Sequence, residues 1–475
     1  MPIGAAPLAM AADPPKVTPA APVSPSDAAV KLPARYPDAS AHRPTPIPDR
    51  IILTWAGDPS TTQAVTWRTS DEITRGIAQI APALDNGRDI LPAARTEVAK
   101  TTVLETDLGK AAYHSVEFRD LKPASLYAYR VGDGENWSEW SHFRTAHAPR
   151  ESDPEPFSFV YFGDAQNDIK SLWSRVIRQA YSDAPKARFL IHAGDLVTTS
   201  NSDALWGEWF GAAGWINANV PAVPVPGNHE YIRPRDAQGK TIPNSKGRLT
   251  RHWRPQFTLP THGPAGLEET AYTFDFQGAR IVALNSNEQH EEQVKWLERV
   301  LQERPSTSRW TILTFHHPIY STAKGRDNAE LRKLWQPTFD QYGVDLVLQG
   351  HDHTYARMGP RFAENLPSGL NVRDRHAGTV YVVSVSGPKM YNLERNPEMR
   401  RAAEDTQMFQ IVTVDGQSLR YEARTATGVL YDAFELRKRP GQPNEFIDKV
   451  PAGPEHLRPA KPKPAEVKAA AVGGR

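Results

Sequence analysis

The 475-residue chain contains no cysteine. Disulfides, zinc–thiolate sites and thiol nucleophiles are therefore excluded, and any metal must be held by oxygen and nitrogen ligands. No run of about 18 apolar residues occurs, so no membrane-spanning helix is predicted. The formal net charge is +1, which points neither to a nucleic-acid partner nor to an acidic one. The composition is that of a globular protein, and the length predicts two folded units.

Both ends of the chain are poor in residues that can form a core. Residues 1–48 contain twelve prolines among Ala, Ser and Asp, which predicts a disordered leader. Ala9, Ala11 and Ala12 resemble the end of a cleaved export signal, although the first basic residue is Lys16 and the apolar stretch is short. We expect export (periplasmic or secreted), with a cytoplasmic location as the alternative. Residues 438–475 are predicted to form a second disordered tail, basic and rich in proline.

Residues 49–148 are predicted to form an all-β domain. The runs IILTW, AVTWRT, HSVEF and LYAYRV are rich in β-branched and aromatic residues, and turn-forming stretches separate them. In LKPASLYAYRV, Tyr127 follows Leu121 and Pro123, which resembles the tyrosine corner of fibronectin-III-like sandwiches, where the hydroxyl bonds to upstream backbone. No cluster of ionisable residues occurs in this segment, so we assign it no chemistry.

Residues 155–437 alternate strand-like and helix-like segments, which predicts an α/β domain. Buried-strand runs include FSFVYF, ARFLIHA, RIVALN, RWTILTF and VDLVLQ. Between them, DIKSLWSRVIRQAYS and EEQVKWLERVLQER carry apolar residues at helical spacing.

Five of the predicted strands end in polar residues of a similar chemical kind. In α/β sheets, ligands bind beyond the carboxyl ends of strands, so we expect these side chains to share one site. The candidates are Asp164, Asp195, Asn228 with His229, His316 with His317, and His351 with His353. Singly, each has an ordinary alternative: Asp195 as a helix cap, Asn228 as a turn residue, and His316 or His317 as a core histidine.

The set as a whole indicates a site with two metal ions. Two carboxylates, an amide oxygen and three or four imidazoles exceed the needs of one tetrahedral ion. A carboxylate shared between two ions would leave vacancies for water. Two ions about 3.5–4 Å apart clamp the attacking and leaving oxygens of a displacement at phosphorus, and they lower the pKa of bound water.

The ordered motifs GD, GD, GNH, H and GHxH resemble those of the calcineurin-like metallophosphoesterases. The segment DRIILTWAGDPSTTQAVTWRT resembles the amino-terminal domain of purple acid phosphatases. The resemblance implies a metallophosphoesterase β-sandwich flanked by helices, behind a fibronectin-III-like domain. It also implies a dinuclear phosphoester hydrolase that uses a metal-bound hydroxide.

The resemblance further implies a role for each matching residue. Asp164 and His353 would hold the first ion, Asp195 would bridge both, and three residues would hold the second: Asn228, His316 and His351. His229 matches the family's non-ligand histidine, which stabilises the transition state or protonates the leaving oxygen. His317 would lie behind the ligands.

Two positions depart from the family pattern. Purple acid phosphatases carry a tyrosine ligand to ferric iron three residues after the bridging aspartate, where this chain has Thr198. Other members have a histidine two residues after the first aspartate, where this chain has Gln166, a weak ligand or a partner of bound water. Without phenolate, ferric iron is disfavoured, so we expect two divalent ions such as Mn, Zn or Fe(II).

The insert that follows GNHE is rich in basic residues. Arg248 and Arg251 in it are candidates for binding extra phosphates of a substrate, and a solvated loop is the alternative. The expected substrate is a small phosphomonoester, with a phosphodiester or a nucleotide as the runner-up. A competing function of another class is a non-catalytic phosphate- or glycan-binding protein.

Overall fold

The structure is a computed structural model that describes residues 39–149, 155–234, 236, 238, 240, 242, 245–361, 378–439 and 441–459. Most of the predicted leader and the end of the predicted tail lie outside these residues. Among the described residues, no helix combines the length and the apolar character needed to cross a bilayer.

The β-rich part of the chain, from Asp49 to Arg144, forms two four-stranded antiparallel sheets. They pack around a core that includes Trp67, Phe118 and Tyr129. The backbone N–H of Lys122 donates to the Tyr127 hydroxyl at 2.8 Å, the kind of contact that the sequence suggested for this tyrosine. One sheet has the order β1-β2-β6-β5 and the other β4-β3-β7-β8. The bounds are β1 Asp49–Thr54, β2 Gln63–Ser70, β3 Ile77–Pro82, β4 Arg95–Val98, β5 Lys100–Thr106, β6 Gly109–Phe118, β7 Leu126–Gly132 and β8 Ser141–Arg144, with α1 at Gly87–Ala93.

The rest of the fold is built on two seven-stranded sheets. The first has the order β11-β10-β9-β21-β22-β23-β24 and the second β14-β15-β16-β17-β19-β18-β20. The strands of the first are β9 Phe157–Phe162, β10 Leu190–His192, β11 Ala222–Pro224, β21 Met408–Asp415, β22 Ser418–Thr425, β23 Leu430–Arg439 and β24 Gln442–Asp448. Those of the second are β14 Tyr272–Phe276, β15 Ala279–Ala283, β16 Trp310–Phe315, β17 Leu346–Gln349, β18 Tyr355–Arg361, β19 Thr379–Val383 and β20 Met399–Ala403. A short pair, β12 Tyr231–Ile232 and β13 Arg248–Leu249, lies apart.

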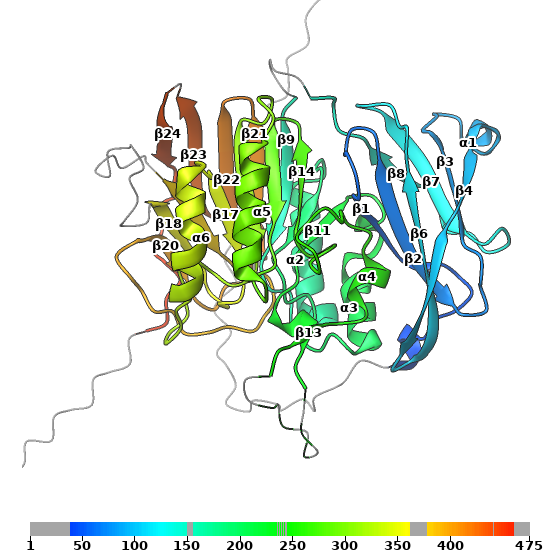
Figure 1. Ribbon diagram of the computed structural model, residues 1–475, viewed down its shortest axis with the longest axis horizontal. Helices are drawn as coiled ribbons and strands as arrows, with labels where there is room; N and C mark the ends of the chain where they lie inside the picture. The colour runs from blue at the N-terminus through cyan, green and yellow to red at the C-terminus, as the bar shows by residue number, and fades with distance from the viewer. Residues whose placement is uncertain are drawn as a thin grey trace, which may run out of the picture. The chain divides into compact units, whose positions relative to one another are not determined.

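Alternation along the strands divides the interior into two cores. In β17, Leu346 and Leu348 face the large core that both sheets share, whereas Val347 faces a second core under the helices. Figure 1 shows α5 (His290–Gln302) and α6 (Ala329–Gln341) lying across the second sheet, where their apolar faces fill that second core. Helices α2 Ser174–Asp183 and α3 Asp203–Ala213 pack into the first core, and α4 is Trp253–Gln256. The parallel strands β10, β11, β15, β16 and β17 are therefore buried along their whole length, as strands covered on two faces are, whereas the antiparallel strands β14 and β22 alternate.

The predicted tail is wrong for its first part. Residues 442–448 form β24, which pairs with β23 and packs Phe446 against the large core. His456 makes a bridge to Ala403 in the second sheet. The Pro-rich composition of this segment hid a hairpin. The tight turn before β24 places Gly441 in the left-handed region, at φ +66°. The remaining residues, 460–475, lie outside the described part of the chain.

A buried ion cluster joins the β-rich part to the part of the chain that carries the two seven-stranded sheets. Asp203, at the start of α3, accepts hydrogen bonds from Arg50 at 2.8 and 2.9 Å and from Arg68 at 2.6 Å. Its side chain is fully buried. Removing one partner of a buried ion pair leaves an uncompensated charge, at a cost of about 3–5 kcal/mol.

We expect Asp203→Asn to lower the free energy of unfolding by about that amount, measured by urea titration. The matched control is Asp49→Asn, which removes another partner of Arg68 whose side chain is 41% exposed. Arg68 is buried, but in this variant it keeps its ion pair with Asp203, and the side chain at position 49 stays hydrated, so the control should lose clearly less stability than Asp203→Asn. Equal losses in the two variants would show that the cluster does not join the two parts.

Candidate metal centre

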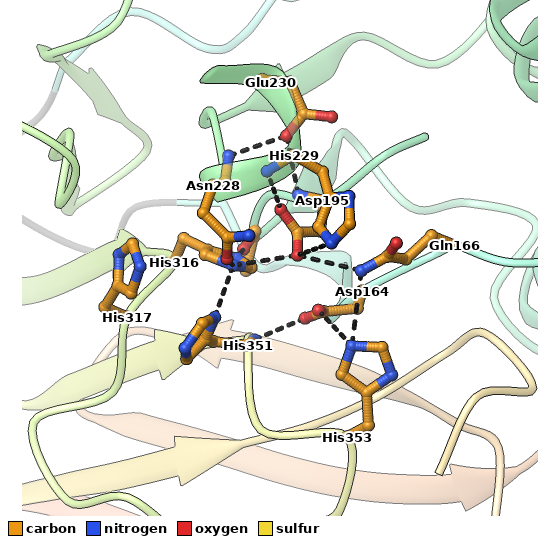
Figure 2. A network of polar contacts seen from close by, with 12 residues as sticks. Asp164, Gln166, Asp195, Asn228, His229, Glu230, His316, His317, His351 and His353 are labelled. Carbon is orange, nitrogen blue, oxygen red and sulfur yellow. Dashed lines mark hydrogen bonds and ion pairs between the residues drawn. The ribbon is translucent and has the colours of Figure 1, made fainter. Parts of the chain in front are cut away.

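The predicted site residues converge at one edge of the two sheets. Strands β9, β10 and β11 run parallel, as do β15, β16 and β17, so within each group the carboxyl ends lie together. A bridge joins Asp164, after β9, to Val385, after β19, and β19 runs parallel to β17, so the strand ends of the two sheets meet. Figure 2 shows the side chains from these ends pointing toward one another: Asp164, Asp195, Asn228, His229, His316, His351 and His353.

Glycines precede four of these residues because their neighbours leave no room for a side chain. A Cβ on Gly163 would lie 1.9 Å from the carbonyl oxygen of Ser384, and one on Gly227 would lie 2.2 Å from an oxygen of Asp195. We predicted these glycines from the need for sharp turns at strand ends. The turn requirement holds for Gly194, which has a φ of +89°, whereas close approach of the loops is the reason at the other three. Asp195 (φ 51°) and His351 (φ 72°) adopt the left-handed backbone themselves.

Two carboxylate hydrogen bonds fix that unusual backbone. The N–H of His351 donates to Asp164 Oδ1 at 2.6 Å, and the N–H of Asp195 donates to Glu230 Oε2 at 2.9 Å. Non-glycine residues held in the left-handed region cost on the order of 1–3 kcal/mol and persist where the surroundings over-determine them. The strain therefore lies at Asp195 and His351, two of the residues whose side chains face the centre.

One half of the centre is formed by Asp164 and His353. The Nε2 atom of His353 lies 3.0 Å from Asp164 Oδ2, and its Nδ1 donates to the carbonyl oxygen of Lys389 at 2.8 Å. That second contact leaves the Nε2 lone pair of the neutral ring directed at the centre. Burial disfavours ionisation of Asp164, but the charges of His353 and His316 outweigh it and lower the pKa of this carboxyl.

The other half brings three side chains around the Nε2 atom of His316. This atom lies 3.1 Å from Asn228 Oδ1, 3.1 Å from His351 Nδ1 and 3.2 Å from Asp195 Oδ2. The His316 Nδ1 atom donates to the carbonyl oxygen of Ala193 at 2.9 Å, so Nε2 carries the lone pair in the neutral ring. Four lone-pair atoms thus converge, an arrangement that requires a proton or a cation between them.

Ionisation in this half follows from burial and from the facing charges. Burial disfavours the charged form of His316, but the carboxylates of Asp195 and Asp164 outweigh it and raise its pKa to about 10. Burial also opposes ionisation of Asp195, whose pKa the nearby His316 and His229 nevertheless lower. For His351, burial and the positive His316 both lower the pKa. The half therefore combines an anionic Asp195, a positively charged His316 and a neutral His351.

Asp195 is the side chain that faces both halves. Its Oδ2 atom contacts His316 and also accepts a hydrogen bond from Gln166 Nε2 at 3.0 Å. Ligand atoms of Asp164, Asp195 and His316 all lie within 4.8 Å of one another. The same is true of His316, His317 and His351.

His229 and Thr198 contact each other beside the centre. The Nδ1 atom of His229 donates to the backbone oxygen of Thr198 at 2.6 Å, and its Nε2 lies 3.9 Å from Asp195 Oδ2. The ring is part-exposed and lines an open hollow together with Thr198, His317 and His351. Thr198 therefore contacts the site through its carbonyl group.

His317 and Gln166 are the remaining predicted residues. His317 Nδ1 lies 2.8 Å from Ser286 Oγ, which also accepts a hydrogen bond from the His317 N–H. Burial and the positive His316 lower the pKa of His317 to about 3. Gln166 is fully buried, and among the described residues its Oε1 atom has no hydrogen-bond partner.

Glu230 is a residue of the site that the sequence analysis missed. Its carboxylate accepts hydrogen bonds from the N–H groups of Gly227 at 2.8 Å, Asp195 at 2.9 Å and Leu196 at 3.0 Å. It thereby ties the loop after β10 to the loop after β11. The signal was its place directly after GNH in the sequence.

The basic insert places two basic residues beside the centre, but they are not the two that were predicted. A second hollow adjoins the centre and is lined by Arg233 and Lys246. Arg248 and Arg251 are exposed and line neither hollow. Arg248 lies in β13, whose pairing with β12 sets which side chains of the insert face the centre.

Comparisons with known proteins identify the family of both folded parts of the chain. The family model of the purple acid phosphatase N-terminal domain matches residues 48–145, and that of calcineurin-like phosphoesterase matches residues 157–355. The chain is 27% identical over 340 residues to "Acid phosphatase type 7" of Mus musculus, covering 66% of this chain and 71% of that protein. It is 24% identical to "Probable inactive purple acid phosphatase 1" of Arabidopsis thaliana, covering 68% of this chain and 57% of that protein.

The solved structure of purple acid phosphatase PPD1 from yellow lupin seeds superposes with a TM-score of 0.69 at 20% identity, covering 82% of this chain and 74% of that one. This likeness confirms the predicted α/β fold class. Together, the two family models and the fold confirm the resemblance drawn from the motifs. The chain therefore carries a calcineurin-like phosphoesterase domain, of a family of metal-dependent phosphoester hydrolases, preceded by the N-terminal domain of purple acid phosphatases.

Proposed function

We propose that this chain hydrolyses phosphomonoesters at a centre of two metal ions. Asp164 and His353 would hold the first ion, Asp195 would bridge, and Asn228, His316 and His351 would hold the second. The observation that carries the proposal is the convergence of potential ligand atoms: Asp164 and His353 lie 3.0 Å apart, and three atoms, from Asp195, Asn228 and His351, lie 3.1–3.2 Å from His316 Nε2.

The residues present fit such a centre. All donors are carboxylate, amide or imidazole groups, which suit divalent first-row metals. The Oδ2 atom of Asp164 is buried and, in the described part of the chain, faces only the ring of His353. When bound, two such ions supply a nucleophile from water and stabilise charge on phosphoryl oxygens.

The chain's own contribution to the reaction centres on His229. Its Nδ1–H is held by the Thr198 carbonyl, which leaves Nε2 as the atom that gains or loses a proton. The side chain is 27% exposed, so a substrate entering the open hollow can reach it. His229 would protonate the leaving oxygen or donate to a phosphoryl oxygen.

We further propose that both ions are divalent and that the centre is colourless. Thr198 replaces the tyrosine of purple acid phosphatases, and the contact it makes at the site is through its backbone oxygen. The buried Gln166 amide, whose Nε2 contacts Asp195, is placed to bind an ion through oxygen if the amide is rotated. We expect no visible charge-transfer band in the metal-loaded protein. A band that survives in Thr198→Val would contradict divalent ions here.

Two measurements together test the proposed function. Elemental analysis of the purified protein should give about two ions per chain. With those ions present, p-nitrophenyl phosphate should be hydrolysed faster than bis-p-nitrophenyl phosphate. Faster hydrolysis of the diester would favour a phosphodiesterase of the same family, and preferential hydrolysis of nucleotides a nucleotidase.

The similarity to a relative named inactive gives a specific alternative, a non-catalytic phosphate- or glycan-binding protein. Two bound ions without turnover on a broad panel of phosphoesters would favour it. We also propose export, which the alanine-rich start supports. Cell fractionation of the expressed full chain tests that proposal.

A further inference from the structure

A hollow beside the metal centre has not yet been given a role. It has a volume of about 530 Å³ and shares four wall residues with the open hollow over the centre: Asn228, Tyr231, Arg233 and His317. We call it the side hollow. Asn228 and His317 belong to the centre, so a substrate bound there can extend directly into the side hollow.

Two cations on the wall of the side hollow have no partner among the described residues. Within the described part of the chain, Arg233 and Lys246 form neither an ion pair nor a hydrogen bond, whereas the neighbouring Arg254 lies 3.7 Å from a carboxylate oxygen of Glu269. The carboxylate on the wall is Glu288, which accepts a hydrogen bond from the Tyr231 hydroxyl at 2.5 Å. The two cations are therefore available to an anion.

Most of the other residues on the wall carry polar side chains. Among the described residues that line it, Leu331 is the single aliphatic side chain, and the others are mostly amides and hydroxyls: Ser245, Ser286, Asn287, Gln289 and Asn328. Such a wall suits a hydrogen-bonding group better than an apolar one. Arginine in particular matches the geometry of phosphate and carboxylate.

The surface beyond the side hollow has the opposite charge. An adjacent hollow shares His290, Asn328 and Leu331 with it and is lined by four carboxylates and one lysine: Glu291, Glu292, Asp327, Glu330 and Lys333. An anion would be repelled there. The favourable position is thus confined to the part of the wall near Arg233 and Lys246.

We infer that the side hollow binds the leaving part of the substrate, and that this part carries a second anionic group, a phosphate or a carboxylate, held by Arg233 and Lys246. This inference rests on the proposed function. It names the substrate class as phosphomonoesters whose alcohol is itself anionic. It also moves the predicted phosphate contact of the insert from Arg248 and Arg251 to these two residues.

Three aryl phosphates test the inference: phenyl phosphate, para-carboxyphenyl phosphate and hydroquinone bisphosphate. In Arg233→Gln/Lys246→Gln, the loss of kcat/KM for the bisphosphate should exceed the loss for phenyl phosphate by about tenfold, mainly through KM. If para-carboxyphenyl phosphate shows the same extra loss of kcat/KM as the bisphosphate, any anion can bind there. If its extra loss is smaller, phosphate is preferred. The excess should shrink as ionic strength rises.

The matched control, Arg248→Gln/Arg251→Gln, removes two charges from the same insert outside the side hollow. It should lower kcat/KM equally for all three esters. An excess for the bisphosphate as large as in the first variant would overturn the inference, and so would equal losses for the three esters in the first variant.

Turnover of phenyl phosphate by the wild-type protein reports on the proposed function separately. If no ester is turned over, calorimetric titration of the metal-loaded protein with the same esters still decides the side hollow. Tighter binding of the bisphosphate than of phenyl phosphate, lost in Arg233→Gln/Lys246→Gln, supports it, and equal affinities overturn it.

Discussion

Asp195→Asn should release both metal ions and reduce turnover by at least about 10³-fold. The Oδ2 atom of Asp195 lies 3.2 Å from His316 Nε2 and 3.0 Å from Gln166 Nε2, between the two halves of the centre. An amide at this position keeps the shape but loses the negative charge. Each ion would then lose an anionic ligand, and removal of such ligands generally weakens metal binding severely. Elemental analysis should fall from about two ions per chain toward zero.

Asp164→Asn gives the contrasting result that makes this prediction specific. The Oδ2 atom of Asp164 faces His353 at 3.0 Å, so the loss should fall on the first ion and leave about one ion per chain. If both variants lost the same number of ions, Asp195 would not be the shared ligand.

Loss of a buried carboxylate in general must also be excluded as the cause of metal release in Asp195→Asn. Asp432, on β23 of the first sheet, is fully buried and pairs at 2.7 Å with Arg357, on β18 of the second sheet. Asp432→Asn therefore removes an equally buried carboxylate that is absent from the candidate centre. It should lower the unfolding midpoint, while the folded protein keeps two ions. Loss of metal in this variant would mean that the centre responds to general destabilisation.

The residues around Asp195 were predictable because of where strands end. Leu346 and Leu348 face one core and Val347 the other, so the run VDLVL reads as a strand buried on both faces. Parallel strands of this kind end at one edge, and the polar residue after each end then has a defined place. That is why Asp164 and His353, 189 positions apart in the chain, could be placed together from the sequence.

Other features depend on contacts that no local pattern records. Glu230 acts through backbone N–H groups of two loops, and backbone groups leave no signature in the sequence. The choice between Arg233 and Arg248 is made by the pairing of β12 with β13, a two-residue ladder in an irregular loop. Strand β24 escaped prediction because its composition is that of a disordered tail, and its pairing with β23 is visible only in the structure.

His229→Asn should lower kcat by about 10²–10⁴-fold while leaving two ions bound. The Nδ1 atom of His229 donates to the Thr198 carbonyl at 2.6 Å, and the backbone N–H of His229 donates to Asp195 Oδ1 at 2.8 Å. The asparagine variant keeps that backbone contact and removes the ring nitrogen that faces the open hollow. Elemental analysis of the same sample separates this loss from loss of metal.

The leaving group decides which of two roles His229 has. If Nε2 protonates the leaving oxygen, the loss in His229→Asn should be at least about tenfold larger for an alkyl phosphate than for p-nitrophenyl phosphate, because nitrophenolate departs without a proton. If Nε2 instead donates to a phosphoryl oxygen, the two esters should lose the same factor, since charge on that oxygen develops in both reactions. A variant with undiminished kcat on both esters would remove His229 from the mechanism.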